Sequence, residues 1–209
     1  GTLTAKDARA EEPKRGGHLK LGLKGGATTD SLDPAAYSGS VSFVIGHLWG
    51  DTLVESDPKT GAPLPALAES WEPSADASEW TFKIRSDVSF HDGSKLTVAD
   101  VVATLKRHAD EGSKSGALGL MRSIKTIEEK AGALVLTLTE GNADLPLLLT
   151  DYHLIIQPKG GVDNPASPIG TGPYKLSSYE AGLRATFEKN ADDWRSDRGY
   201  VDTIEMIAM

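Results

Sequence analysis

The chain has 209 residues, of which 39% are apolar and 25% charged, and it carries a net charge of −8 at pH 7. This composition suits a globular protein with one large core or two small ones, and the excess of acidic over scattered basic residues argues against a nucleic acid or an anionic membrane as partner. No apolar run approaches the ~18 residues that a membrane-spanning helix needs, and the lack of cysteine excludes disulfides, thiolate metal sites and a cysteine nucleophile.

Residues 1–17 are predicted to be a disordered lead-in, because they are small or charged and show no periodicity. Within this stretch, Ala8-Arg9-Ala10 has the small-x-small form of a signal-peptidase site. No apolar segment precedes the tripeptide in this sequence, so an exported origin and a chance match both stay open.

Apolar periodicity predicts two strands and two helices in the first half of the chain. Residues 18–23 alternate with three leucines on one face, and residues 79–85 alternate with two aromatic residues and an isoleucine on one face, so both are predicted strands. Residues 40–49 carry apolar side chains at helical spacing. A second helix is predicted from Thr97, because Thr97 and Asp100 form a capping-box-like pattern ahead of an apolar stripe.

Hairpins predominate in the second half. The predicted elements there are a hairpin of strands 124–130 and 133–139, a short helix starting at Asn142 or Asp144, a buried strand at 152–156, and strands at 174–179, 183–188 and 201–208. Because hairpin strands dominate, helices are few and no βαβ array is visible, the predicted fold class is α+β with mixed β-sheets.

The Gly-Thr-Gly sequence at 170–172 does not fit a phosphate-binding loop. Such a loop needs the pattern GxxxxGK[ST] followed by a helix, whereas a strand is predicted here and Pro173 has no amide hydrogen to donate. The glycines within 25–28 do follow a strand, but they lack the third glycine of a dinucleotide fingerprint and lead into Asp30. We interpret both stretches as turns and predict no nucleotide cofactor.

No catalytic or metal-binding constellation is visible in the sequence. The five histidines show none of the HxH, HExxH or HxxxH spacings, and the adjacent His91 and Asp92 lie in a predicted turn, where a structural role is expected. There is no G-x-S-x-G motif, and thirty acidic residues offer too many pairs to single out two for glycoside chemistry. No metal, cofactor or enzymatic activity is predicted, and a hydrolase acting on an acyl substrate is the alternative.

Four sequence blocks occur in an informative order and spacing. They are SLDPA (31–35), LVESDPKTGAPLPALAESWEPSAD (53–76), WTFKIRSDVSFHDGSKLTVADVVATLKR (80–107) and PIGTGPYKLSSYEAGLRATFEKNADDW (168–194). Together they resemble the extracytoplasmic solute-binding proteins of peptide and nickel ABC importers (family 5), which include the oligopeptide-, dipeptide- and nickel-binding proteins. The resemblance covers residues 17–209.

The resemblance implies a two-lobed clamp that buries a ligand between its lobes and hands it to a membrane permease. Residues 18–49 and 163–209 would form the discontinuous, incomplete main sheet of a periplasmic-binding-protein-like lobe one, and residues 50–162 a smaller inserted subdomain. Because family members are at least twice this length, the chain would be an N-terminal fragment without the second lobe. A monomeric, periplasmic or membrane-tethered protein without enzymatic activity is implied.

By position, the resemblance assigns three stretches to the rim of the cleft. They are Gly25, Gly26, Ala27 and Thr28; Gly116, Ala117 and Leu118; and Asp151, Tyr152 and His153. The glycine-rich stretch would let a ligand backbone approach and accept amide hydrogen bonds, and Asp151 and His153 would offer charge. Nickel-complex binders of the family use an arginine and aromatics at this rim, and residues 150–156 contain no arginine, so a peptide is preferred over a nickel chelate. A signalling member that presents its ligand to a receptor is a further alternative.

Overall fold

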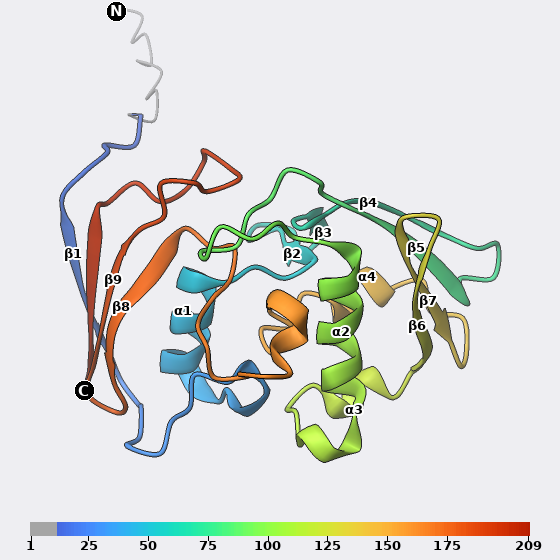
Figure 1. Ribbon diagram of the computed structural model, residues 1–209, viewed down its shortest axis with the longest axis horizontal. Coiled ribbons are helices and arrows are strands. Elements are labelled where there is room, and N and C mark those ends of the chain that lie inside the picture. Colours follow the sequence, from blue (N-terminus) through green and yellow to red (C-terminus); the bar gives the residue numbers. More distant parts are fainter. Residues whose placement is uncertain (1–11) are drawn as a thin grey trace, which may run out of the picture.

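The structure, a computed structural model, describes residues 12–209. A four-stranded mixed sheet forms one side of the molecule (Figure 1). Its strands, in order across the sheet, are β1 (His18–Leu23), β10 (Thr203–Ala208), β9 (Arg184–Lys189) and β8 (Tyr174–Glu180). β1 runs parallel to β10, whereas β10, β9 and β8 pair antiparallel. The two ends of the described chain therefore meet in one sheet.

Helix α1 (Gly39–Trp49) lies against this sheet (Figure 1). Val41, Ile45 and Trp49 pack with Phe187 and Met206 in one hydrophobic cluster, which we call the sheet core. Buried and exposed side chains alternate along β9 and β10, as expected for strands with one covered face. A one-residue slip would turn these apolar side chains to solvent, so burial against α1 fixes the register.

A second, antiparallel sheet lies beyond α1. Its strands, in order, are β4 (Ala68–Pro73), β5 (Glu79–Ile84), β7 (Ala133–Leu138) and β6 (Ile124–Lys130). Helix α2 (Val98–Ala109) packs on this sheet and buries Val101 and Leu105 in a second cluster, the subdomain core. The predicted capping box is confirmed, since the Thr97 hydroxyl accepts from the Asp100 amide at 3.3 Å and the Asp100 carboxylate accepts from the Thr97 amide at 2.8 Å.

Short elements connect these layers. They are η1 (Pro34–Ala36), β2 (Val54–Ser56), β3 (Pro63–Pro65), η2 (Glu111–Ser113), α3 (Leu118–Met121), α4 (Leu145–Leu148) and η3 (Pro158–Gly161). Periodicity does not predict β2, β3 and β4, because prolines at 58, 63, 65 and 73 interrupt the alternation that marks a strand.

Residues 154–156 connect the two cores. Leu154 and Ile156 belong to the subdomain core, whereas Ile155 belongs to the sheet core. The prediction of a strand at 152–156 is wrong, since no strand is formed there and the Ile156 amide donates at 3.0 Å to the carbonyl of Asp51, which lies outside any strand. The alternation is real, but it distributes side chains between two cores rather than between two faces of a sheet.

Residues 15–17, within the stretch predicted as a disordered lead-in, contact the segment that precedes β10. The Gly16 amide donates to the Tyr200 carbonyl at 2.7 Å, and the Gly17 amide donates to the Asp202 carboxylate at 3.2 Å. The Arg15 guanidinium lies 5.0 Å from the centroid of the Tyr200 ring. The small-x-small tripeptide at 8–10 lies outside the described residues.

Candidate ligand-facing loops and a buried ion network

The Gly-Thr-Gly segment at 170–172 packs tightly against the end of α1. A Cβ atom on Gly172 would lie 2.5 Å from the Trp49 carbonyl carbon, and one on Gly170 would lie 2.7 Å from the Trp49 ring. Neither contact leaves room for a side chain. The Gly172 amide donates to the Trp49 carbonyl at 3.0 Å, which fixes the approach of the two backbones. The glycines therefore serve the packing of this segment on α1.

His91 also binds the segment 170–172. Its Nε2 lies 2.9 Å from the Gly172 carbonyl oxygen, and its amide donates to the Gly170 carbonyl at 2.9 Å. Burial lowers the pKa of His91, which favours the neutral ring. Asp92 closes its own turn by accepting from the Ser94 amide at 2.9 Å. The structural role expected for His91 and Asp92 is confirmed.

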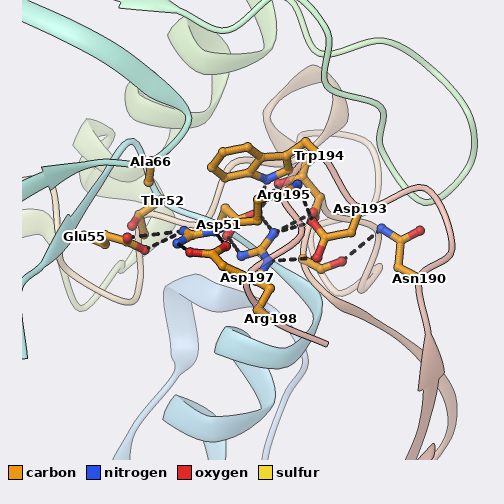
Figure 2. Close-up of polar contacts among 12 residues, drawn as sticks. Asp51, Thr52, Glu55, Ala66, Asn190, Asp193, Trp194, Arg195, Asp197 and Arg198 are labelled. Carbon is orange, nitrogen blue, oxygen red and sulfur yellow. Dashed lines mark hydrogen bonds and ion pairs between the residues drawn. The ribbon is translucent and has the colours of Figure 1, made fainter. Parts of the chain in front are cut away.

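Asp51, two residues after α1, is the centre of a buried ion network (Figure 2). Asp51 is only 9% exposed, and its carboxylate accepts from both terminal nitrogens of Arg198, from the Thr171 hydroxyl at 2.7 Å and from Trp194 Nε1 at 2.9 Å. Arg198 also donates to Asp193 at 2.8 and 2.9 Å. We call these five residues the Asp51 network.

Asp51 and Arg198 both remain charged in the Asp51 network because each is paired with a group of opposite charge. Burial alone would raise the pKa of Asp51, but the hydrogen bonds and charge of Arg198, together with Trp194 and Thr171, outweigh burial and lower that pKa. Burial opposes the charge of Arg198 too, and the two carboxylates of Asp51 and Asp193 nevertheless raise its pKa. Asp51 is thus an ionised group surrounded by donors, which suits a structural anchor rather than a general base.

A second group of charges lies beside Trp194 (Figure 2). Arg195 forms a two-pronged pair with Asp197 at 2.6 and 2.7 Å and reaches Glu55 at 3.1 Å. Three guanidinium carbons lie 4.7, 5.3 and 5.3 Å from the centroid of the Trp194 ring, within reach of a cation–π interaction. They belong to Arg85, Arg195 and Arg198. These contacts fasten the segment after β9 to the residues that follow α1.

Nothing in the sequence marks Asp51 as the partner of these groups. The stretch 192–198, DDWRSDR, is dense in charges of both signs around a tryptophan, and that density is the one signal of an ion network. The partner lies on a different part of the chain, so only the folded structure identifies it.

The first predicted rim stretch lies at the carboxyl end of β1, beside the turn between β8 and β9. Gly25 and Gly26 have φ values of 100° and 94°, and the four residues 25–28 are exposed. The Gly25 amide donates to the Met209 carbonyl at 3.3 Å, and the Ala27 amide donates to the Asp30 carboxylate at 2.9 Å. A Cβ atom on Gly182 would lie 2.6 Å from the Ala27 carbonyl carbon, so the β8–β9 turn supports this loop directly.

The second and third predicted rim stretches come together. Gly116 lies against the His153 ring so closely that a Cβ there would overlap Nε2, and the Gly116 amide donates to the Ala35 carbonyl at 2.9 Å. Ala117 is buried and Leu118 begins α3. Within residues 12–209, no hydrogen bond joins the stretch 25–28 to either of the others.

Asp151 and His153 form a charge pair with each other. Their side chains meet at 2.6 Å through Nδ1, and His153 is only 8% exposed. Burial would lower the pKa of His153, but the hydrogen bond and charge of Asp151 outweigh it and raise that pKa. Burial would raise the pKa of Asp151, and His153 lowers it instead. A ligand would therefore meet a compensated pair and the ring of Tyr152, which stacks on His153 at a centroid distance of 4.2 Å.

A hollow of about 420 Å³ lies alongside α1, within the volume range of small-molecule sites. Phe43 and Tyr152, with ring centroids 5.5 Å apart, line it together with Asp51, Glu55 and Arg198. Phe43 is 46% exposed, so part of its ring faces solvent at this hollow. Tyr152 is the predicted rim residue that reaches this hollow.

Among residues 12–209, no group of three or more histidine, aspartate or glutamate side chains is arranged to hold a metal ion. No helix in that part of the chain combines the length and apolarity needed to cross a membrane.

Comparison with known families identifies the class of protein. The model for the middle region of the bacterial extracellular solute-binding proteins, family 5, matches residues 62–209. The chain therefore belongs to this family, and the resemblance carried by the four sequence blocks is confirmed.

Individual relatives agree with this assignment. The oligopeptide-binding protein AppA of Bacillus subtilis (strain 168) is 30% identical over 93% of this chain, which spans 37% of AppA. The structure of the PBP AgaA from A. tumefaciens R10 in complex with agropinic acid matches with a TM-score of 0.82 at 30% identity, over 92% of this chain and 40% of AgaA. The structure of DppA from Helicobacter pylori with the peptide STSA matches with a TM-score of 0.80 at 27% identity, over 94% of this chain and 43% of DppA.

The chain thus spans less than half the length of these relatives. The α+β class with mixed sheets, as part of a periplasmic-binding-protein-like fold, is confirmed.

Proposed function

We propose that this chain forms one side of the substrate-binding component of an ABC importer, which captures a peptide or a related small solute between two lobes and delivers it to a membrane permease. Membership of solute-binding family 5 carries the proposal. The names of the relatives support a peptide, since AppA is an oligopeptide-binding protein and DppA holds a peptide in its structure. A monomer acting in the periplasm completes the proposed role.

Recognition through main-chain groups fits the proposed rim. The exposed loop 25–28 begins with two glycines, so a ligand backbone can approach its peptide groups closely. Hydrogen bonds between main chains hold peptides of many sequences, because they do not read side chains. In this proposal the stretches 116–118 and 151–153 contribute a second contact, in which Tyr152 offers an aromatic surface.

A second lobe would complete the site by excluding water. Hydrogen bonds strengthen when a ligand is enclosed in a medium of low dielectric constant, and a peptide held on one side only stays hydrated on the other. We therefore expect this chain alone to bind a peptide weakly or not at all.

Titration calorimetry with a mixed tetrapeptide library tests the proposal on this chain and on the longest product of its gene. We expect binding heat with the longer product and little or none with the chain. Equal affinities would contradict the need for a second lobe. Agropinic acid is the comparison ligand, since a relative binds it. If the protein binds that acid and no peptide, the proposed ligand changes from a peptide to a small organic acid.

Two further measurements separate this role from its alternatives. A serine-reactive probe should leave the longer product unlabelled, and stoichiometric labelling would contradict a purely binding role in favour of a hydrolase. Deletion of the gene should abolish uptake of the solute that co-purifies with the protein. Uptake that persists while a signalling response is lost would favour a receptor-presenting protein.

A further inference from the structure

His153 is bound at both ring nitrogens by groups that only accept hydrogen bonds. Nδ1 lies 2.6 Å from a carboxylate oxygen of Asp151, and Nε2 lies 2.9 Å from the carbonyl oxygen of Tyr37. Neither an ionised carboxylate nor a carbonyl has a proton to give. Both nitrogens of His153 must therefore donate, and a histidine that donates from both is an imidazolium.

The two bonds join separate segments of the chain. Tyr37 directly follows η1, whereas Asp151 and His153 follow α4. A third segment enters through Gly116, whose lack of a side chain makes room for the His153 ring. The Gly116 amide donates at 2.9 Å to the carbonyl of Ala35, which lies within η1. The imidazole thus lies at the meeting point of 33–37, 115–118 and 151–153.

We propose that His153 is a positioning residue for the ligand rim, and that it holds the segments 33–37, 115–118 and 151–153 together only while its ring is protonated. The coupling of the three segments rests on the contacts within the described residues, and its effect on ligand binding rests on the proposed function. A neutral ring carries only one N–H and can donate only one of the two hydrogen bonds. At the other contact, the unprotonated ring nitrogen faces an oxygen, and two acceptors then face each other. The bond to Tyr37 is the one lost, because the remaining N–H binds the charged Asp151 more strongly.

The titratable groups around His153 include one other cation, Arg107, which has its own carboxylate partner. They are Asp151 and Tyr152 on its own segment, Tyr37 and Asp33 on the segment before α1, and His108 and Arg107 on α2. The segment 115–118 contributes no titratable side chain. Arg107 is compensated by Asp33 at 2.6 Å. Asp151 remains to balance His153.

His108 stays neutral beside this pair. It is fully buried, its Nδ1 bonds the Ser115 hydroxyl, and its Nε2 has no partner among the described residues. Burial, reinforced by the nearby Arg107, lowers the pKa of His108 to about 4. A second imidazolium therefore does not compete with His153 for Asp151 at neutral pH.

The direction of the pH effect follows from the sign of the shift. Asp151 raises the pKa of His153 above its ordinary 6.5, so the stabilisation from this contact is fully present below that value. It is lost as the pH rises through the raised pKa. The coupling of the three segments should therefore weaken as the pH rises above 6.5 and through the raised pKa of His153.

Nuclear magnetic resonance on this chain tests the coupling without a ligand. We expect both ring nitrogens of His153 to carry protons at about pH 6. Protection of the Gly116 amide against hydrogen exchange, corrected for the intrinsic rate, should fall about threefold to tenfold between about pH 6 and pH 9, the scale of one hydrogen bond. In His153→Gln the protection should be low at both pH values. His18→Gln, which changes an exposed histidine of β1, should keep the wild-type response.

Two results in the wild-type chain would overturn the proposal: a neutral His153 ring at about pH 6, or protection of the Gly116 amide that does not change with pH. Both are measured on the wild-type chain, so neither depends on whether a variant folds. Peptide affinity of the longest gene product is measured over the same range. An affinity that stays constant while Gly116 responds would overturn the effect on binding. Absence of any peptide binding would count against the proposed function, while the resonance data would still decide the coupling.

Discussion

Asp51 is a carboxylate that the fold removes from water and supplies with four hydrogen-bond donors. Desolvation of such a group is costly, and the pair with Arg198 compensates for it only while both partners are present. Removing one partner leaves a buried charge without compensation, which is worse than having no pair at all. The two residues therefore depend on each other more than an exposed pair does.

Replacement of Asp51 by alanine should lower the free energy of unfolding by about 3–5 kcal/mol, because Arg198 keeps only Asp193 as a carboxylate partner and the donors Thr171 and Trp194 lose their acceptor. Urea unfolding at constant m-value measures the change. Glu55→Ala is the control, since the Glu55 side chain is 39% exposed in its pair with Arg195 and should contribute below about 1 kcal/mol. Equal losses for the two variants would contradict the account.

The acid dependence of stability should also report on Asp51. Its folded pKa lies below the ordinary 3.8, so its contribution is present above that value and is lost as the pH falls through the folded pKa. The urea midpoint of the wild-type chain should therefore fall in acid. Asp51→Asn, which cannot ionise, should start lower near neutrality and change less steeply. Parallel pH curves for the two proteins would show that Asp51 is not the group responsible.

At the scale of elements, the contact between α1 and the segment 170–172 depends on glycine. Gly172→Ala should destabilise the protein by about 1–3 kcal/mol, the usual cost of overpacking, since the added Cβ meets backbone atoms that cannot rotate away. Gly119→Ala is the matched control in α3, where a Cβ meets nothing within 4 Å. Thermal unfolding of both variants distinguishes them, and a Gly172 variant as stable as the Gly119 variant would refute the packing argument.

The elements that sequence predicts well are those determined by neighbours in the chain. The cap of α2 needs only Thr97 and Asp100, and the β6–β7 hairpin needs only a turn that tolerates positive φ, which Ala131 and Gly132 supply at 49° and 76°. The stretch 154–156 is different, because side chains that alternate in direction fit either a strand in a sheet or a segment that packs into two cores. Only the tertiary structure decides between these two arrangements.

The candidate site shows the same limit. The resemblance to family 5 suggests which stretches approach the ligand, and it does so by position alone. That His153 is buried beneath Gly116, with Tyr37 on its second nitrogen, depends on contacts between distant segments. Local patterns carry no information about such contacts, so the pairing of Asp51 with Arg198 and the surroundings of His153 could not be predicted.

At the scale of the whole molecule, one short segment, 154–156, contributes side chains to both cores. Ile155→Ala should lower the free energy of unfolding by about 2–5 kcal/mol, because it opens a cavity beneath α1. Hydrogen exchange should then rise in both β9 and β7, since the segment belongs to both cores. Ile207→Ala, at a side chain that is 37% exposed, should have little effect. Faster exchange in β9 alone would mean that the cores unfold independently.

The placement of Ile155 limits how this architecture can be shortened. Its side chain fills the space left by Gly46 on α1 and by Gly50, which follows α1, yet it comes from within the proposed insertion 50–162. A protein trimmed by splicing residue 49 directly to residue 163 would lose that filling and leave Gly46 uncovered in α1, the helix that supports the first sheet. We therefore expect the smallest version able to fold alone to retain the part of the proposed insertion that carries Ile155.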